Sequence, residues 1–562
     1  MTLRLALAAT AAGWVLIGTA AVAGPQDAIH SAIDRGDWST VLKLAQPLAD
    51  QGDAEAELEI GGLYDDGDGV KKDYARAAEW YRKAADQGNA PAMASLGVLY
   101  ENGRGVAKDI GEAARWYRKA ADAGSGDGAL YLGLMYDERG ALKTDYAQAE
   151  KWYRMAWDNG VSAGANNVGL LYAYGEGVKK DTAEAARWYR KAADKGDADG
   201  EMNLAFLYED GDGVPKNMGQ AYLLMRKAAE AGQTTAETGL GYLYDTGQGV
   251  KQDYAAAFAW YAKAAGAGDI EAVYNLARLY QLGRGTKADI AQALKLYRGA
   301  ALAGDATSQD ALGDLYFDGK SVKQDYAEAL SWYRKAADQK NADAEASLGV
   351  MYEDGDGVSA DTHAALQWYR KGADDGSSQA QYDLGLMYSN GKGVAADPRE
   401  AAKWYRKAAD QGDADAENNL ANLMLNGLGL KKDVAGAVAL YRTAADGGNP
   451  VAAFNLGSEY EDGKNLKQDY AEAAKWYRKA ADANDPDGLA GLGRLYAEGK
   501  GVTRDVVQAY MYLSLAVRTY ANSDEDNRGA AEGDLDAIAE KMTDAEIAEA
   551  HKKAADWKPA DA

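Results

Sequence analysis

Apolar and small residues recur along this chain with a fixed period of 36 residues. The tyrosine that ends one apolar stretch is Tyr64, and a tyrosine stands at every 36th position up to Tyr496, except at Met424. A second stretch begins at Trp80, and Trp, Leu or Tyr occupies each equivalent position up to Tyr512. Thirteen copies fit between residues 53 and 520. A strict period of this length predicts a stack of small helical units, none of which buries its apolar face alone.

Each copy predicts two helices joined by a glycine turn. The first stretch places apolar or small residues on one helical face, namely Ala56, Ile60, Gly61, Leu63 and Tyr64. Gly67 and Gly69 follow, where a helix must stop and the backbone must accept a positive φ. Position 73 is Asp in twelve copies and Asn217 in the other, which predicts the N-cap of a second helix. That helix carries small residues and aromatics on one face, namely Tyr74, Ala77, Ala78, Tyr81, Ala84 and Ala85.

Two positions predict close contact between helices. Ala77 has alanine at every equivalent position, and Gly61 has glycine at ten, with Ala205, Ala277 and Ala421 at the others. Glycine inside a helix costs about 1 kcal/mol relative to alanine. Its repeated use therefore indicates that a neighbouring element approaches the backbone closely.

At these residues the chain resembles the Sel1-like repeat family, which is related to tetratricopeptide repeats. The resemblance rests on residues 56–73 and 74–88 and on their twelve repeats along the chain. A tetratricopeptide array would show a 34-residue period instead. It implies an all-α solenoid of thirteen 36-residue helix-turn-helix repeats that forms a right-handed superhelix. Three residues depart from the repeat pattern and put local loop geometry in question, but not the fold. Arg139 replaces the first loop glycine, Met225 replaces the second-helix tyrosine equivalent to Tyr81, and Trp157 replaces an alanine.

The two ends differ from the repeats. Residues 1–23 read as a signal peptide, with Arg4, an apolar run from Leu5 to Ile17, and Ala21 and Ala23 before the expected cleavage site. Residues 24–52 read as an N-terminal capping half-repeat, in which Asp37 and Trp38 align with Asp73 and Tyr74. Residues 521–562 are expected to form C-terminal capping helices over about 529–542 and 543–557, the second opened by a capping box at Thr543 and Glu546.

Composition narrows the possible partners. Lys plus Arg number 62 against 87 Asp plus Glu, a net charge of −25, which argues against nucleic acid and anionic membranes as partners. The chain has no cysteine, so disulfides are excluded. No stretch after the signal region is long and apolar enough for a membrane anchor, so an exported soluble protein is expected.

The motifs that could carry chemistry are weak. Residues 160–164 match the G-x-S-x-G pattern of a nucleophile elbow, but they occupy the ordinary turn between two copies instead of a strand-to-helix turn. Residues 65–69 suggest a calcium loop, yet Ala75 stands where a bidentate Glu is required. The three histidines, His30, His363 and His551, suggest no metal cluster. We therefore expect neither catalytic residues nor a cofactor nor a metal.

A partner surface is predicted on the first helix of each repeat, by analogy with related solenoids, in which that helix lines the concave side. On a helical wheel the positions two, five and six before each repeat tyrosine point away from the core. The candidate residues there are Val98, Tyr131, Leu134, Asn167, Leu170, Met202, Asn203, Phe206, Tyr242, Tyr274 and Asn275. Apolar bulk beside amide groups suits an extended peptide or a partner helix. The alternative is that these residues pack against the neighbouring repeat.

Three functions follow from these observations and from the resemblance. The first is an exported, non-enzymatic scaffold or adaptor, periplasmic or secreted in a Gram-negative bacterium and monomeric, that binds a protein or peptide on its concave face. The second is a periplasmic regulator of an envelope sensor, which requires different affinities for two states of that sensor. The third is β-lactam binding or hydrolysis as in cysteine-rich relatives, although this chain has neither their cysteines nor a supported nucleophile.

The export prediction can be checked by intact mass. Small residues at Ala21 and Ala23 predict that the mature protein begins at Gly24. A mature species in the envelope fraction that still carries residues 1–23 would indicate a retained anchor instead.

Overall fold

The computed structural model describes residues 25–137, 140–520 and 525–559, and this part of the chain consists of thirty α-helices without a strand. It divides into two compact units. The first extends to Ala272 and includes 284–286, and the second comprises 273–283 and the chain from Lys287. The predicted signal peptide and Arg139 lie outside the described residues.

Each repeat contributes a pair of helices, as the sequence predicts. The first helices are α3 (Ala54–Asp66), α5 (Ala90–Asn102), α7 (Gly126–Tyr136), α9 (Ser162–Tyr174), α11 (Ala198–Asp210), α13 (Thr234–Thr246), α15 (Ile270–Leu282), α17 (Ala306–Asp318), α19 (Ala342–Asp354), α21 (Ser378–Asn390), α23 (Ala414–Asn426), α25 (Pro450–Asp462) and α27 (Pro486–Glu498). The second helices are α4 (Tyr74–Asp86), α6 (Ile110–Asp122), α8 (Tyr146–Asp158), α10 (Thr182–Ala193), α12 (Met218–Glu230), α14 (Tyr254–Gly266), α16 (Ile290–Leu302), α18 (Tyr326–Ala337), α20 (Thr362–Asp375), α22 (Pro398–Ala409), α24 (Val434–Asp446), α26 (Tyr470–Asp482) and α28 (Val506–Thr519).

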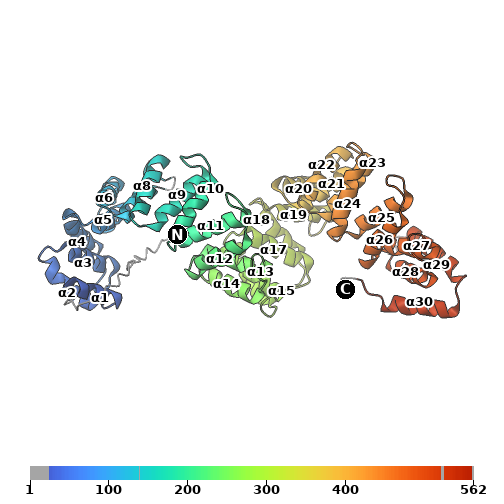
Figure 1. Cartoon of the computed structure of the whole chain (residues 1–562), viewed down its shortest axis with the longest axis horizontal. Coiled ribbons are helices and arrows are strands. Elements are labelled where there is room, and N and C mark those ends of the chain that lie inside the picture. Colours follow the sequence, from blue (N-terminus) through green and yellow to red (C-terminus); the bar gives the residue numbers. More distant parts are fainter. Residues whose placement is uncertain (1–24, 138–139, 521–524, 560–562) are drawn as a thin grey trace. The chain divides into compact units, whose positions relative to one another are not determined.

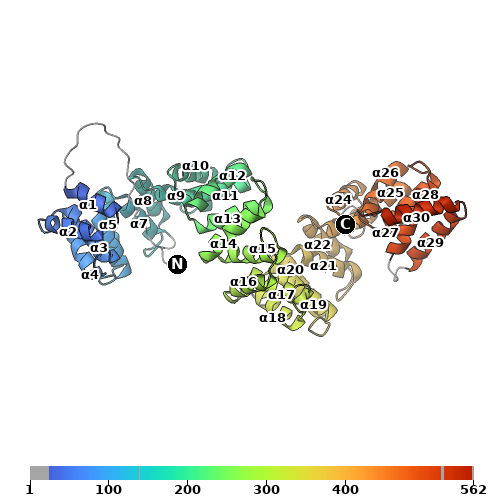
Figure 2. The same ribbon diagram turned by 90° about the horizontal axis from the view of Figure 1, so that it is seen from below.

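Within each unit the helix pairs stack one on the next (Figures 1 and 2). First helices of successive repeats also touch each other, as α5 touches α7 and α9 touches α11 in the first unit, and α19 touches α21 in the second. Among the described residues of the repeats, no two second helices approach as closely. First helices of successive repeats therefore pack against each other more extensively than second helices do.

The predicted close contact at Gly61 is with the tyrosine of the second helix. A Cβ atom added to Gly61 would lie 2.5 Å from the ring of Tyr81, and one added to Gly97 would lie 2.5 Å from Tyr117. Both rings are buried, so the glycine is the recess into which each ring packs. The requirement is not absolute, because Ala277 packs in the same core as the buried ring of Tyr297.

The buried tyrosine hydroxyl needs an acceptor, and the end of the first helix supplies one. Tyr117 donates to Glu101 at 2.7 Å and Tyr153 donates to Asp137 at 2.8 Å. Burial, with the charge of Glu101 adding to it, raises the pKa of Tyr117 well above its usual value. The tyrosine therefore remains a neutral donor, and each hydrogen bond ties the two helices of one repeat together.

Caps and turns form where the sequence predicts them. Asp73 accepts hydrogen bonds from the backbone N–H groups of Ala75 and Arg76, and Asn217 caps α12 in the same way. Gly67 ends α3 at φ 79°, and its N–H donates to the carbonyl of Leu63. The glycine turn and the polar cap together fix where one helix ends and the next begins.

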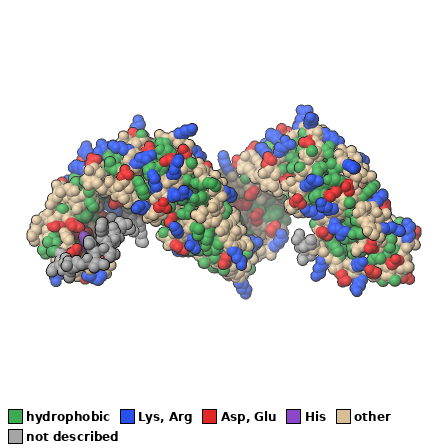
Figure 3. Space-filling model, viewed as in Figure 1, with side chains coloured by type: hydrophobic (Ala, Val, Ile, Leu, Met, Phe, Trp, Pro, Cys, Tyr) green, Lys and Arg blue, Asp and Glu red, His purple; other side chains and the backbone are tan. Residues whose placement is uncertain are grey.

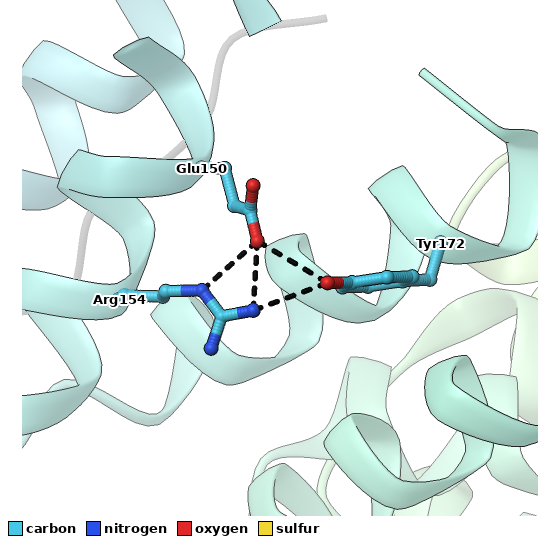
Figure 4. Close-up of polar contacts among 3 residues, drawn as sticks. All are labelled: Glu150, Arg154 and Tyr172. Carbon is cyan, nitrogen blue, oxygen red and sulfur yellow. Dashed lines mark hydrogen bonds and ion pairs between the residues drawn. The ribbon is translucent and has the colours of Figure 1, made fainter. Parts of the chain in front are cut away.

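An arginine of the second helix joins most repeats to the next one. Figure 4 shows this bond for Arg154 of α8, whose Nη2 donates to the Tyr172 hydroxyl of α9 at 3.3 Å and to Glu150 at 2.7 Å. The same guanidinium lies 4.7 Å from the centroid of the buried Trp188 ring. Equivalent bonds connect Arg82 to Tyr100, Arg118 to Tyr136, Arg190 to Tyr208, Arg298 to Tyr316, Arg334 to Tyr352, Arg370 to Tyr388, Arg442 to Tyr460 and Arg478 to Tyr496.

Two of the departures are absorbed locally. Met225 is buried at the position equivalent to Tyr81 on the second helix. In the same repeat, Ala205 stands at the position equivalent to Gly61. Trp157 is half-buried and packs against the core that contains Ala165 and Val168. The fold therefore tolerates a changed core residue without losing a helix.

The ends of the described chain are also helical. The N-terminal pair is α1 (Pro25–Asp34) and α2 (Trp38–Ala49), and Asp37 caps α2 as its alignment with Asp73 predicts. At the C-terminal end, α29 spans Glu525–Ala539 and begins earlier than the predicted start at Gly529. The capping box of Thr543 and Glu546 is present at the start of α30 (Asp544–Asp556). Both α29 and α30 pack against α28.

The carboxyl group of Asp310 in the second unit is largely buried, which destabilises its ionised form. Asp310 lies on α17, and one of its oxygens is buried without a hydrogen-bond partner among the described residues. Burial, reinforced by the charges of Asp314 and Asp343, raises its pKa to about 8. The unfolded chain releases this proton near the ordinary pKa of 3.8, so the folded state is progressively penalised between pH 4 and pH 8.

The first stability prediction concerns the tight alanine contact. Ala293 is completely buried on α16, so Ala293→Leu should destabilise the protein by about 1–3 kcal/mol through overpacking. Removing the N-cap of the same helix with Asp289→Ala should cost about 0.5–2 kcal/mol. Denaturant melts measure both, with the exposed Ala291→Leu as control. An unchanged midpoint for Ala293→Leu would contradict the close contact.

The second stability prediction concerns pH. Asp310→Asn should leave the melting temperature nearly unchanged near pH 4 and raise it increasingly up to pH 8, above which the difference stays constant, because both states of the parent are then ionised. Thermal melts across this range test it, with Asp374→Asn as an exposed control. A difference that does not vary with pH would mean that Asp310 is ionised throughout.

Candidate functional site

The predicted surface residues all lie on first helices, but their exposure varies. Three of them expose large apolar side chains, with 43% of Leu134, 36% of Phe206 and 42% of Tyr242 accessible. They stand at equivalent positions of α7, α11 and α13 in the first unit. These three side chains face solvent, as the wheel predicts.

Other predicted residues are half-buried and also serve packing. Val98 packs against the core around Tyr117 and Leu132, and Leu170 packs against the core around Tyr189 and Leu204. Met202 packs against the core that contains Met225, and the Tyr131 ring lies 5.2 Å from that of Tyr117. These four residues are therefore partly structural, which is the alternative that the sequence left open.

Tyr274 and Asn275 belong to the second unit, whereas the other nine residues belong to the first. Both are half-buried on α15. The Tyr274 ring lies 5.7 Å from that of Tyr297, so it supports the core of its own repeat. These two residues consequently do not belong to the candidate surface of the first unit.

A chain of amides runs between two first helices. Asn203 donates from Nδ2 to Oδ1 of Asn166 at 2.8 Å, and Asn166 donates to Asn167 at 3.5 Å. Asn166 is buried, whereas Asn167 and Asn203 are half-exposed. The buried amide of Asn166 therefore orients that of Asn203, and both half-exposed amides have further donor and acceptor positions.

The same arrangement recurs seven repeats later in the second unit. There Asn455 donates to Asn418 at 2.9 Å, and Asn418 donates to Asn419 at 3.3 Å. Asn167 and Asn203 were among the predicted residues, but Asn166 was not, although it stands six residues before Tyr172, a position that the wheel places away from the core; the structure instead buries its side chain. The recurrence of adjacent asparagines at one repeat position was the available signal.

A pocket of about 320 Å³ opens between first helices of the first unit. It is lined by Glu101 of α5, Leu134 of α7, Asn167 and Leu170 of α9, and by Asp137, Gly140 and Ala141 after α7. The predicted residues Leu134, Asn167 and Leu170 thus come together around one hollow, while Phe206 and Tyr242 lie on later helices.

The two carboxylates of this pocket were missed by the sequence reasoning. Glu101 follows Val98 by three residues, and Asp137 follows Leu134 by three, so each lies on the same helical face as an apolar candidate. That spacing could have identified both carboxylates from the sequence, because an Asp or Glu also follows the first-helix tyrosine in other repeats. On the face drawn in Figure 3, acidic and basic side chains are interspersed.

The rejected chemical motifs occupy ordinary turns. Gly160 has φ 91° in the turn before α9, and the Ser162 hydroxyl donates to Asp197 at 3.0 Å. Residues 65–69 form the end of α3 and the turn after it. Among the described residues, no three His, Asp or Glu side chains gather as metal ligands would. No described helix is long and apolar enough to cross a membrane.

Comparisons with known proteins agree with this architecture. The family model described as Sel1 repeat matches thirteen consecutive segments, 54–89, 90–125, 126–161, 162–197, 198–233, 234–269, 270–305, 306–341, 342–377, 378–413, 414–449, 450–485 and 486–518. A search of the curated proteins found no match.

Two solved structures are similar to this chain. One is a protective antigen present in uropathogenic Escherichia coli strains and displaying an SLR fold, with 31% identity, 91% of this chain and 93% of that chain covered, and a TM-score of 0.49. The other is a Sel1 repeat protein from Oxalobacter formigenes, with 30% identity, 59% and 93% covered, and a TM-score of 0.42.

Sel1 and tetratricopeptide-like solenoids are typically non-enzymatic scaffolds for protein–protein interaction, which agrees with the resemblance seen in the sequence. The right-handed superhelix that the resemblance implies stays a prediction. Because the thirteen matched segments extend over most of the sequence and coincide with the helix pairs, the chain belongs to the Sel1 repeat family.

Proposed function

We propose that the chain is an exported, non-enzymatic scaffold that binds a protein or peptide on the first helices of its first unit. One observation carries this proposal: Leu134, Phe206 and Tyr242 expose large apolar side chains at equivalent positions of three repeats. Large apolar side chains repeated in register on an exposed helix face are typical of interaction sites.

The chemistry beside these side chains favours a polypeptide. Asn203 presents an amide group that is oriented by its hydrogen bond to the buried Asn166, and Asn167 presents a second amide on the neighbouring first helix. An amide can donate to a carbonyl and accept from an N–H group, which are the groups that a peptide backbone offers. Apolar anchors with oriented amides between them suit an extended segment or one face of a helix.

Export to the periplasm or beyond is part of the proposal and is supported by the sequence. Residues 1–23 have the charge, apolar run and small residues of a signal peptide. The length of the array supports stability without disulfides, because each repeat gains an interface with its neighbours. We propose that the scaffold acts as a monomer in a Gram-negative envelope.

The test is a double substitution on this surface. Changing Phe206 and Tyr242 together to Ser should reduce partner capture at least tenfold, because truncating a hot-spot side chain at the centre of an interface costs about 2 kcal/mol or more of binding. The helical circular-dichroism signal and the melting temperature should stay nearly unchanged, since both side chains are exposed. Capture is measured by photocrosslinking from position 134 in envelopes of the source organism.

The matched control changes Leu223 and Leu302, which are also exposed but lie on second helices, to Ser. This control should capture the same crosslinked partner as the parent. Early melting of the Phe206 and Tyr242 variant would show that these residues are structural. Normal melting with undiminished capture would place the binding surface elsewhere.

A further inference from the structure

A second hollow lies between two second helices of the second unit, α24 and α26. Its volume is about 500 Å³. Four cationic side chains line it, in a chain whose net charge is −25. These cations are Arg442 of α24 and Lys475, Arg478 and Lys479 of α26, and the other lining residues are Trp476, Asp446 and Asp482.

The hollow forms beside a repeat that departs from the usual second-helix pattern. Leu440 stands where most repeats have Trp, and Thr443 stands where most have Lys. On α26 the same two positions hold Trp476 and Lys479. A smaller pair of side chains on one helix leaves space beside the larger pair on the other, because protein interiors are otherwise closely packed.

The two arginines of the hollow are oriented but keep their charge. Nη2 of Arg442 donates to the Tyr460 hydroxyl at 3.0 Å. Arg478 donates from Nη2 to Tyr496 and from Nη1 to Tyr512, the latter at 3.3 Å. A phenol is neutral, and neither arginine forms an ion pair with a described residue. A guanidinium has five N–H donors, so each arginine retains donors for an anion.

The two lysines are already paired, yet the hollow remains cationic. Nζ of Lys479 contacts the Asp446 carboxylate, and Nζ of Lys475 lies 3.5 Å from Glu472, outside the lining. Asp482 is the remaining carboxylate of the lining. Four cations against three carboxylates leave one positive charge in excess. The potential in the hollow is thus opposite in sign to the charge of the whole protein.

The indole of Trp476 adds an unused donor to the lining. Only 7% of this residue is exposed, and its Nε1 is buried without an acceptor among the described residues. A buried donor without an acceptor is unfavourable. The equivalent nitrogens of Trp152, Trp188 and Trp404 are unpaired too, so the indole supports a ligand site here only together with the two arginines.

We infer that this hollow binds the phosphate group of a small ligand, as inorganic phosphate or as a phosphate monoester, between Arg442 and Arg478. The guanidinium groups form charge-assisted hydrogen bonds with the phosphate oxygens, and Lys475 and Lys479 add attraction as point charges. A phosphate monoester offers three strong acceptor oxygens, which suits donors that come from two helices. The site is separate from the first-helix surface proposed for a polypeptide.

Other anions fit this hollow less well. A nucleic acid or an acidic polypeptide would bring many charges to a protein of net charge −25 and would be repelled outside the hollow. A carboxylate has two oxygens in one plane and a single charge, so it gains less from two guanidinium groups on different helices. The volume of about 500 Å³ leaves space for the organic group of a small monoester.

The test is calorimetric titration of the full chain with inorganic phosphate, glycerol phosphate and acetate at equal ionic strength. Both phosphates should bind more tightly than acetate, and the tighter of the two identifies the form that the site prefers. Added salt should weaken both. Arg442→Gln should reduce phosphate affinity at least about tenfold, because a hydrogen bond between charged groups is lost.

Charge variants inside and outside the hollow locate the binding. Asp482→Asn removes a repulsive charge and should increase phosphate affinity about threefold. Arg118→Gln loses the equivalent bond to Tyr136 in the first unit, with the same change of net charge as Arg442→Gln, and should leave the affinity unchanged. Should Arg442→Gln melt early, Lys475→Gln, at a side chain that is 67% exposed, should still weaken binding.

The absence of saturable heat with both phosphates would overturn the proposal, as would acetate binding as tight as that of phosphate. Phosphate affinity that is unchanged in both Arg442→Gln and Asp482→Asn would overturn it as well, because the anion would then bind elsewhere. The lining contains no first-helix residue, so these results are independent of the capture test with Phe206 and Tyr242.

Discussion

The packing of the second-helix tyrosine into the glycine of the first helix is the contact on which the other features of each repeat depend. Because a Cβ atom at Gly61 would overlap the Tyr81 ring, the two helices can approach closely only with a very small residue there. The approach buries the phenol, and the buried hydroxyl must find an acceptor. An acid directly after the first-helix tyrosine provides it in some repeats, as Glu101 does for Tyr117, whereas Gln281, Asp314 and Asn422 accept in others. One steric contact thus explains why a glycine and a tyrosine recur together and why a polar acceptor lies near the end of the first helix.

The same contact orients polar groups at the ends of the first helices. In the first unit the acceptors include Asp65, Glu101 and Asp137, which accept hydrogen bonds from Tyr81, Tyr117 and Tyr153. Preorganised groups lose less freedom on binding than mobile ones. Between the repeats, the arginine–tyrosine bonds hold successive helix pairs in register, as Arg154 and Tyr172 do. A surface assembled from several repeats can be specific only if those repeats keep their register.

Local chemistry explains why much of the fold was predictable. The N-cap at Asp73, the positive φ of Gly67 and the burial of Ala77 follow from backbone and packing rules that act over a few residues, and all three were predicted. The start of α29 was missed by four residues, because the polar stretch before Gly529 gives no strong helix signal. Where the chain departs from the pattern, as at Met225, a side chain of similar volume fills the same space.

The sequence by itself determined the repeat, its helix pairs and the family, because a period of 36 residues records one packing arrangement thirteen times. It also identified the helix face that carries Leu134, Phe206 and Tyr242. Only the tertiary structure decided which candidates are free for a partner. Leu134 and Leu170 occupy equivalent positions of neighbouring repeats, yet their exposure differs, since exposure depends on the side chains of adjacent helices. The pocket likewise required residues from three helices to meet, and helix spacing in the sequence cannot specify such a meeting.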